Sequence, residues 1–359
     1  MTWRGPRALI CLTAVAVSLA FSAEAGAAPN NFFGVSSVSD PTTAQLQRIA
    51  AGGARASRVE LYWGAVEPTP GARRWNAFDA VVADAARTGV TILPVLFGTP
   101  SWVSPNPASP PIYTAQGRSA WATFILDLTL RYGTNGSFWA LHPELPRTPI
   151  TTWQIWNEVN LPAFWGGKPN TRGYVDLLRL TREPLLRGDP AAKVVLAGLI
   201  PFKTTAPGSV GGEKYLQRLM KVKGIRKLFE AVAIHPYGKS PSIVLKALLQ
   251  TRELLNALGA RRIPLWVTEF GWSTGGVAWS SSPFRATPAT QATRVRQSYG
   301  LLLKNRKRLR LKRAFYFSLA DFDQPNIEDD WSARMGLFDL NGQPKPAWYA
   351  YVRRAGGLP

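Results

Sequence analysis

The sequence predicts an α/β fold in which eight parallel strands, each followed by a helix, close into one barrel. Three observations lead to this expectation. Short apolar runs recur along the chain, and each precedes a segment with helical periodicity. Most runs are continuously apolar, as in parallel strands that are covered on both sides. No interdomain linker interrupts the alternation, so the 359 residues suit a single-domain (β/α)8, or TIM, barrel with loop insertions.

Eight apolar runs are predicted as strands. In chain order they span residues 32–35, 56–62, 90–97, 150–156, 193–197, 231–234, 263–268 and 313–318. Helix ends between them carry capping signals. Asp40 followed by Pro41 predicts an N-cap, Thr88-Gly89 predicts a C-terminus, and the amphipathic segment 242–259 also ends in glycine.

Four long segments rich in Gly, Pro, Ser and Thr are predicted as loops. Segments 98–116, 199–211 and 271–287 follow the third, fifth and seventh strands. We therefore expect them on the face formed by the carboxyl ends of the strands, where active sites of such barrels lie. The segment 133–149 precedes the fourth strand and is expected at the opposite end.

The first 27 residues have the features of an export signal. Arg4 and Arg7 precede an apolar stretch of 14 residues, 8–21, and Ala-Gly-Ala at 25–27 resembles a cleavage site. We expect residues 1–27 to be removed and residues 28–359 to form the barrel, which would be secreted and extracellular or associated with the cell wall. The apolar stretch is short for a bilayer, and no later segment is apolar enough, so no membrane span is expected.

Composition limits how the chain is stabilised and what it binds. Its single cysteine, Cys11, lies in the predicted signal, so the barrel would depend on a large core rather than a disulfide. The formal net charge is +21, and removing two arginines and Glu24 with the signal leaves +20. Such a charge favours anionic partners, including acidic polysaccharide, cell-wall polymer or nucleic acid.

Two acids end predicted strands at the expected active-site rim. Glu158 ends the run TTWQIWNE, and Glu269 ends IPLWVTE. Barrel closure would bring both to the same rim despite their separation in sequence. Paired carboxyl groups are what glycoside hydrolysis requires, because one protonates the leaving oxygen and the other attacks or stabilises the sugar carbon.

Six motifs follow one another over nearly the whole chain beyond the signal. They are SRVELYWGAVEPTPGARRWN at 57–76, FGTPSWVS at 97–104, WQIWNEVN at 153–160, AIHPYG at 233–238, WVTEFGWS at 266–273 and GLFDLNGQPKPAWYAY at 336–351. In this order they resemble the glycoside hydrolases of clan A, especially the xylosidase-like family 39. Asn-Glu and a later Glu, with His-Pro-Tyr between them, form a fairly specific signal.

The resemblance implies roles for five residues. Glu158 would be the general acid/base and Glu269 the nucleophile of a retaining reaction, whose carboxyl groups lie about 5 to 5.5 Å apart. Asn157 would bind the sugar 2-hydroxyl. Arg58 and Tyr237 would hold the Glu269 carboxylate charged and aimed.

Other side chains are candidates for contact with the sugar. His235 would orient a carboxylate or touch the sugar. Related enzymes often have tryptophan at the end of the eighth strand, whereas residues 315–324 contain none, so Phe322 or Trp331 is expected to replace it. Four tryptophans in candidate rim loops would stack on sugar rings: Trp63, Trp102, Trp165 and Trp272.

These residues also have structural interpretations. A strand-end acid can cap a helix, and Arg58 can form a buried ion pair. His235, Tyr237 and any tryptophan can be core side chains. The basic run 304–313 is typical of a solvated helix end. No zinc-finger, phosphate-loop or RNA-recognition pattern is present, so no nucleic acid is expected. The two histidines lack metal-ligand spacing, so neither a metal nor a cofactor is expected.

The sequence therefore predicts a secreted retaining glycoside hydrolase that acts on a β-linked oligosaccharide or polysaccharide, with an acidic polymer as one candidate. No coiled-coil repeat demands a partner, so a monomer is expected. The alternative is a carbohydrate-binding barrel without hydrolytic activity, attached to the cell wall or an exopolysaccharide. A basic nucleic-acid-binding protein is a third possibility. The presence of both glutamates favours the enzyme, while sugar, linkage and endo or exo action stay open.

Overall fold

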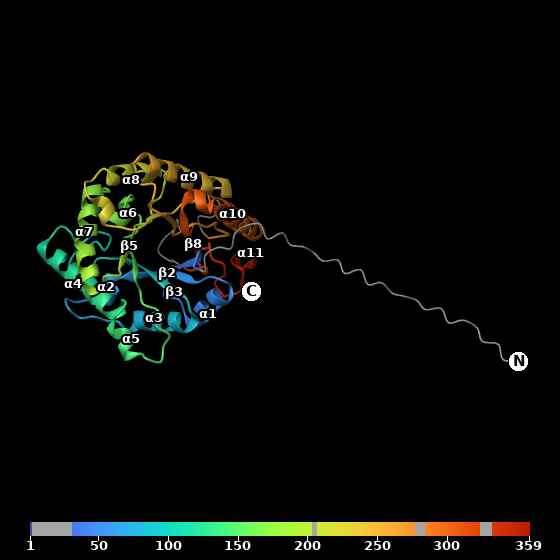
Figure 1. Ribbon diagram of the computed structural model, residues 1–359, viewed down its shortest axis with the longest axis horizontal. Coiled ribbons are helices and arrows are strands. Elements are labelled where there is room, and N and C mark those ends of the chain that lie inside the picture. The colour runs from blue at the N-terminus through green and yellow to red at the C-terminus, as the bar shows by residue number, and fades with distance from the viewer. Residues whose placement is uncertain (2–30, 203–206, 277–283, 324–331) are drawn as a thin grey trace.

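A computed structural model describes residue 1 and residues 31–202, 207–276, 284–323 and 332–359. The predicted signal, residues 1–27, lies almost wholly outside the described residues, and so does Trp331. Eight strands form one parallel sheet in the order β5-β4-β3-β2-β1-β8-β7-β6. Bridges from Val195 to Ala231 and from Leu199 to Ile234 join its two edges. The sheet is thus a nearly closed (β/α)8 barrel with a ring of helices around it (Figure 1).

All eight predicted strands are confirmed, and none of their ends is shifted by more than two residues. The strands are β1 (Phe33–Ser37), β2 (Ala56–Tyr62), β3 (Thr91–Phe97), β4 (Thr152–Ile155), β5 (Lys193–Leu196), β6 (Val232–Ile234), β7 (Leu265–Val267) and β8 (Leu311–Phe317). Most of their residues are buried on both faces of the sheet. This explains why the runs are continuously apolar instead of alternating.

The helices lie between consecutive strands, except that α11 follows the last strand, β8. They are α1 (Thr43–Ala51), α2 (Trp63–Val66), α3 (Asn76–Thr88), α4 (Ala115–Tyr132), α5 (Ser137–Leu141), α6 (Pro162–Trp165), α7 (Thr171–Gly188), α8 (Gly212–Met220), α9 (Pro241–Ala257), α10 (Pro288–Leu309) and α11 (Pro346–Ala355), with a 3₁₀ turn at Ile225–Lys227. None of the helices in the described ranges is long and apolar enough to cross a membrane.

Capping interactions set the helix ends. The predicted N-cap at Asp40 is wrong, because the Thr42 side chain accepts from the backbone of Gln45 while the Gln45 side chain accepts from the backbone of Thr42. This reciprocal capping box starts α1 two residues later. The predicted end of α3 is confirmed, since Gly89 has a φ of 67° and closes the helix in the left-handed conformation.

Apolar side chains fill the barrel interior beneath the active-site rim. Seven residues from several strands form a separate apolar cluster there: Ala56, Leu93, Val195, Ala231, Ala233, Trp266 and Phe315. Ala56 lies two residues before Arg58 on the same side of β2, so this cluster supports the floor on which the Arg58 side chain rests. A larger cluster packs the outer side of the strands against the helices.

The long loops lie where the sequence predicts them. Segments 98–116, 199–211 and 271–287 follow β3, β5 and β7, although parts of the last two are outside the described residues. The segment 133–149 precedes β4 and contains the short helix α5. The basic run 304–313 covers the exposed end of α10 and the start of β8, as expected of a solvated helix end.

Candidate active site

Both predicted glutamates lie just beyond carboxyl ends of strands, Glu158 after β4 and Glu269 after β7. Each residue is only 7% exposed. The chain leaves β4 through two positive φ angles, 70° at Trp156 and 37° at Glu158, which non-glycine residues seldom adopt. The Trp156 indole donates to the carbonyl of Phe164 at 2.5 Å and holds this turn in place. Such backbone strain is typical of functional sites.

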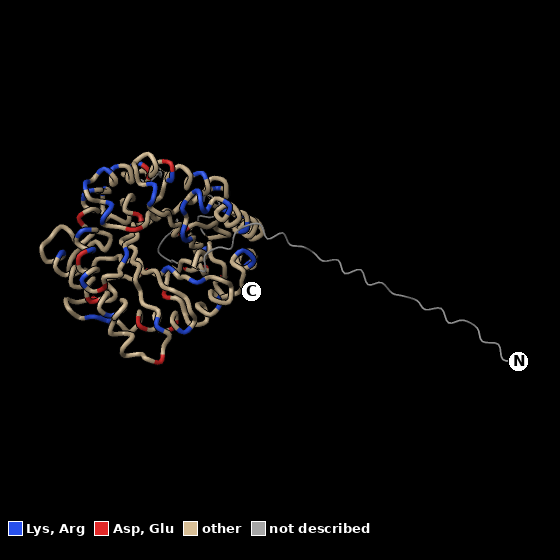
Figure 2. The backbone as a smooth tube through the Cα atoms, viewed as in Figure 1, with Lys and Arg blue, Asp and Glu red and all other residues tan. Residues whose placement is uncertain are grey.

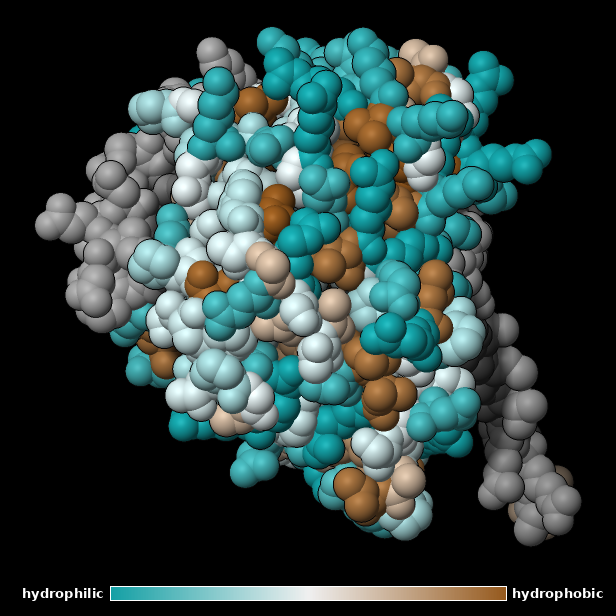
Figure 3. Space-filling model, turned by 90° about the vertical axis from the view of Figure 1, so that its left-hand side faces the viewer, coloured by the Kyte–Doolittle hydropathy of each residue, from teal (hydrophilic) through white to brown (hydrophobic). Residues whose placement is uncertain are grey.

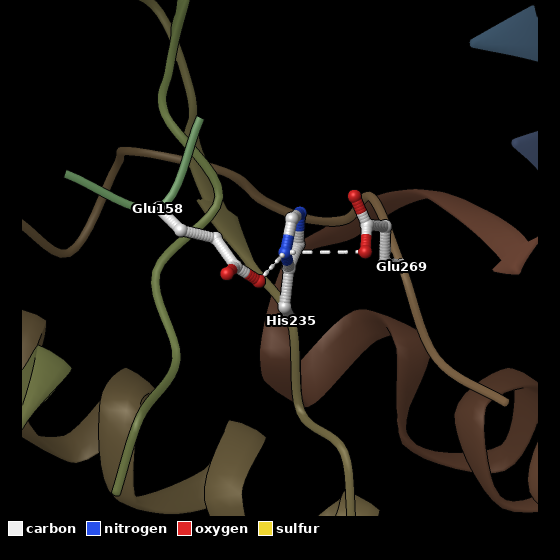
Figure 4. A group of neighbouring side chains, drawn as sticks. All are labelled: Glu158, His235 and Glu269. Carbon is white, nitrogen blue, oxygen red and sulfur yellow. Dashed lines mark hydrogen bonds and ion pairs between the residues drawn. The ribbon is translucent and has the colours of Figure 1, made fainter. Parts of the chain in front are cut away.

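His235 lies between the two glutamates (Figure 4). Its Nδ1 atom is 2.7 Å from Oε1 of Glu158 and 3.5 Å from Oε2 of Glu269. One oxygen of each glutamate and the imidazole nitrogen all lie within 4.8 Å of one another. The carboxyl groups of Glu158 and Glu269 therefore face the same small space.

Arg58 connects four of the strands that surround this space. Its Nη1 atom donates to Oε1 of Glu269 at 2.7 Å and to the hydroxyl of Ser36 at 3.0 Å. Its Nε atom donates to Gln154 at 2.7 Å, and Nη2 donates to Oδ1 of Asn157 at 2.9 Å. Because Asn157 accepts through Oδ1, its amide group remains a donor for another ligand.

Tyr237 completes the hydrogen bonding of Glu269. Its hydroxyl donates to Oε2 of Glu269 at 2.8 Å, while Arg58 donates to Oε1. Burial raises the pKa of Glu269 above its usual value, although the Arg58 charge and the hydrogen bonds from Tyr237 and Arg58 oppose this rise. Two fixed donors therefore offset part of the effect of burial on this carboxyl group and hold it in one orientation.

Glu158 has a different electrostatic environment. Burial, and next the charge of Glu269, raise its pKa well above the usual range, and the Arg58 charge only partly opposes this. Burial and the Arg58 charge lower the pKa of His235 well below its usual value, so its imidazole is neutral. A proton shared by the two acids thus resides preferentially on Glu158, as an acid catalyst requires.

A glycine fixes the other side of the His235 ring. The Nε2 atom of His235 is buried and has no hydrogen-bond partner among the described residues. Gly198, just after β5, lies so close to this atom that a Cβ at position 198 would collide with the ring. The imidazole is therefore held between Gly198 and Glu158.

Three residues of the site were missed by sequence reasoning. Gln154 and Ser36 are buried partners of Arg58, and Gln154 is a polar break within an apolar strand, which is a usable signal. Glu60 lies two residues after Arg58 and so on the same side of β2. Burial raises the pKa of Glu60 to about 7, and the negative charge of Glu269 adds to this rise, while the Arg58 charge opposes it.

The predicted tryptophan platforms are mostly wrong. Three of the four are buried core residues: Trp63, Trp165 and Trp272. The Trp272 indole donates to the carbonyl of Gly238 at 2.8 Å, and its ring packs edge-on against Phe270. Buried rings of this kind present no free face to a sugar. Trp102 is partly exposed, and its indole donates to the carbonyl of Glu67 at 2.9 Å. It therefore remains a candidate for contact with a sugar ring.

The end of β8 offers aromatic rings in place of tryptophan. Phe322 is partly exposed, as its predicted role requires, and its ring lies 6.4 Å from that of Phe317. Phe317 is the last residue of β8, and its ring lies edge-on to Tyr237 at 6.5 Å. Phe317 therefore places an aromatic ring beside Tyr237, whose hydroxyl donates to Glu269.

Glu158, His235 and Glu269 also have enough potential ligand atoms to hold a metal ion. Two observations weigh against that use. Both oxygens of Glu269 already accept hydrogen bonds from Arg58 and Tyr237. The second nitrogen of His235 has no acceptor in the described part of the chain, whereas metal-binding histidines normally have one there. The arrangement fits a proton-transfer site better.

Neither a protein-family model nor a curated protein matches the sequence. Solved structures do match the fold. A family 39 glycoside hydrolase from Bacteroides cellulosilyticus WH2 is 18% identical with a TM-score of 0.65, and the match covers 90% of this chain and 63% of that one. A GH39 β-xylosidase from Caulobacter crescentus is 21% identical with a TM-score of 0.60, covering 92% and 72%.

A GH5_18 protein from Streptomyces cattleya, in complex with Manβ1-4GlcNAc, is 17% identical with a TM-score of 0.65, covering 91% of this chain and 80% of that one. The chain spans less than two thirds of the Bacteroides protein, 63% of its length. At these identities the likeness concerns the fold. The chain has the (β/α)8 barrel fold of clan A glycoside hydrolases and resembles those of family 39.

Proposed function

We propose that this protein is a retaining glycoside hydrolase that cleaves a β-linked oligosaccharide or polysaccharide. The observation that carries the proposal is that two buried glutamates on one rim have different hydrogen-bond partners. Glu269 accepts from Arg58 and Tyr237, whereas the carboxyl group of Glu158 is hydrogen-bonded, among the described residues, only to a neutral His235. One carboxyl group is thus prepared as a nucleophile and the other as an acid.

The distance between the acids supports retention. Retaining enzymes hold their carboxyl groups about 5 to 5.5 Å apart, and inverting enzymes about 6.5 to 9.5 Å apart to admit a water molecule. Oxygen atoms of Glu158 and Glu269 lie within 4.8 Å of each other. This leaves no room for water between the acid and the sugar in the first step.

In the first step, an oxygen of Glu269 attacks the anomeric carbon while Glu158 gives its proton to the leaving oxygen, and the glycosidic bond breaks. The new ester removes the negative charge of Glu269. That charge raises the pKa of Glu158, so its loss lowers this pKa and lets Glu158 act as a base. In the second step Glu158 takes a proton from water, which attacks the anomeric carbon and releases Glu269.

Sugar binding would use the remaining polar groups of the site. The free amide donor of Asn157 is suited to the sugar 2-hydroxyl, an interaction that strengthens as the oxocarbenium-like transition state forms. The β-linkage is supported by the solved structures that share the fold, among them a β-xylosidase and an exo-β-1,4-mannosidase. We propose further that the protein is secreted after loss of residues 1–27 and acts as a monomer.

Azide rescue tests the roles of the two acids on aryl β-glycosides. Glu158→Ala should keep turnover best on substrates with good leaving groups, and added azide should yield a β-glycosyl azide. Glu269→Gly should instead yield an α-azide, because azide then replaces the nucleophile. Exchanged products would reverse the assignment. Glycan binding without turnover, unaffected by Glu158→Gln and Glu269→Gln, would favour the non-catalytic carbohydrate-binding barrel.

A further inference from the structure

A groove of about 980 Å³ lies on the outer ring between α7 and α8, formed by residues that take no part in the acid pair. One wall is the loop before α7 and its first two turns, and the other is the end of α8. The lining residues are Lys168, Pro169, Asn170, Thr171, Arg172, Val175, Asp176, Arg179, Arg218, Lys221 and Val222. A volume of this size is at the upper end of the roughly 300–1,000 Å³ of ligand sites.

The groove is strongly cationic. Five of its lining residues are lysine or arginine, Asp176 is the only acid among them, and all five cations are exposed. Within the described ranges, only Arg179 forms an ion pair, a loose contact of 3.6 Å with Asp176 in which both side chains are half exposed. Figure 2 shows Lys and Arg along this part of the outer ring. Four cations therefore face the solvent without a partner acid in the described part of the chain.

The cations stand on both walls, so one ligand can contact several at once. Lys168 and Arg172 belong to the α7 side, whereas Arg218 and Lys221 belong to the α8 side. The N-terminus of α7, an 18-residue helix, points its positive dipole end into the same region. Figure 3 shows the left-hand face of Figure 1, where long hydrophilic side chains project around smaller hydrophobic patches.

The charged residues of the active-site rim differ from those of the groove. Glu158, Glu269 and Glu60 lie there with Arg58 as the opposing charge, and a smaller neighbouring cleft adds Asp40. Because Arg58 is paired with the Glu269 carboxylate, its charge is not available to attract an anionic sugar. An anionic ligand is therefore expected to bind in the groove on the outer ring and not beside Glu158 and Glu269.

We propose that the α7–α8 groove is a second, non-catalytic binding site for an anionic polysaccharide that repeats a carboxylate or phosphate group along its chain. Arginine guanidinium groups pair with either oxyanion through two hydrogen bonds. No aromatic side chain lines the groove in the described structure, and single-stranded nucleic acid is normally bound by stacking on aromatic rings. A polysaccharide is therefore the better fit, and it would keep the protein near its matrix while the active site acts on neutral β-linked units.

The test compares two charge-reversal variants with the same change in net charge. Arg172→Glu/Arg218→Glu alters one cation on each wall of the groove. Lys304→Glu/Lys307→Glu alters two exposed residues of α10, which α9 separates from the groove along the outer ring (Figure 1). Binding to polygalacturonate, phosphomannan and neutral dextran is measured on the full chain by titration calorimetry at two salt concentrations, after circular dichroism has verified folding.

The groove variant should lose at least about tenfold in affinity for one of the two anionic polymers, since it replaces attraction by repulsion at two contacts. The control should lose less than about threefold, and dextran should not bind. The polymer that the groove variant loses identifies carboxylate or phosphate as the ligand group. Arg172→Gln/Arg218→Gln should give an intermediate loss if charge pairing is responsible.

Equal losses in the groove variant and the α10 variant would overturn the proposal, because binding would then follow total charge alone. Tighter groove-dependent binding of poly(U) than of both anionic glycans would overturn it in favour of nucleic acid. No binding of either anionic glycan by the unaltered chain at low salt would overturn it as well. These measurements involve no turnover, so they do not depend on the proposed hydrolysis.

Discussion

The Nδ1 atom of His235 lies 2.7 Å from Oε1 of Glu158, in a contact between a neutral imidazole and a carboxyl group whose pKa is well above its usual range. The ring has no freedom to turn away, because Gly198 lies against its opposite nitrogen. The general-acid candidate is thus positioned by a histidine that is itself positioned by a glycine. This chain of contacts can be tested without altering either acid.

Gly198→Ala should lower kcat about a hundredfold, because a shift of roughly 1 Å in a reacting group can cost this much. The added methyl collides with the His235 ring and moves it away from its place beside Glu158. Rates on good and poor leaving groups provide the specific measurement, since loss of acid positioning harms poor leaving groups most. Gly300→Ala in α10 is the control and should keep the unaltered rate. Normal kcat for Gly198→Ala on poor leaving groups would show that the position of His235 is unimportant.

Glu60→Gln should move the alkaline limb of the pH-rate profile to lower pH. The negative charge of Glu60 contributes to the raised pKa of Glu158, so its removal lets Glu158 lose its proton at lower pH. Because the pKa of Glu60 is about 7, its charge is present mainly above that pH, and the acidic limb should move less. The profile of kcat/KM on one aryl glycoside measures this. A shift of the alkaline limb to higher pH would contradict the electrostatic interpretation.

Arg58→Leu should lower the free energy of unfolding by about 3 to 5 kcal/mol, because it leaves the buried Glu269 carboxylate without its partner. The pKa of Glu269 should rise, since Arg58 lowers it, and the acidic limb of the rate profile should move to higher pH. Urea unfolding followed by tryptophan fluorescence measures the first effect. Adding Glu269→Gln to Arg58→Leu should restore part of the stability.

The matched control for Arg58 is an exposed ion pair. Arg187 contacts Glu183 at 3.0 Å on the surface of α7, with both side chains more than half exposed. Arg187→Leu should cost less than about 1 kcal/mol. Similar losses for Arg58→Leu and Arg187→Leu would mean that the Arg58 network contributes little to stability.

Trp272 and Trp102, two of the four candidate tryptophans, should respond differently to substitution. Trp272→Ala should lower the free energy of unfolding by about 3 to 5 kcal/mol, as expected for loss of a buried ring. Trp102→Ala should cost less stability and raise KM for an oligosaccharide if its exposed part contacts sugar. Unfolding curves and Michaelis constants for the two variants separate these effects. An unchanged KM for Trp102→Ala would remove it from the substrate site.

Most of the barrel and the positions of its acids could be predicted from the sequence. Apolar runs with a helix after each gave the strands, and a polar pair such as Asn157-Glu158 directly after an apolar run indicates a strand end at the rim. The orientation of a ring such as Trp272 could not be predicted, because an apolar aromatic residue after a strand fits both core and platform. Gly198 beside His235 is a contact between separate strands that local patterns do not encode.

The N-cap of α1 and the site residue Glu60 are two features that were not predicted from local sequence patterns. Asp40-Pro41 is a good capping signal, yet the reciprocal bonds of Thr42 and Gln45 give a better one two residues later. Glu60 is not among the candidate residues, although it lies within the predicted strand 56–62. The two-residue period of the strand shows that it shares a side with Arg58, so this residue was within reach of sequence reasoning.

The most direct test of the central proposal is covalent labelling of the protein with 2-deoxy-2-fluoro β-glycosides that carry good leaving groups. The fluorine slows both steps but leaves formation of the glycosyl-enzyme faster than its hydrolysis. Intact-mass analysis and peptide mapping should find one sugar bound to Glu269 in the unaltered protein and no sugar on the Glu269→Gln variant. The adduct would also identify a sugar that the protein accepts. Labelling of Glu158 instead, or turnover of the same sugars with inversion and without any adduct, would contradict the account.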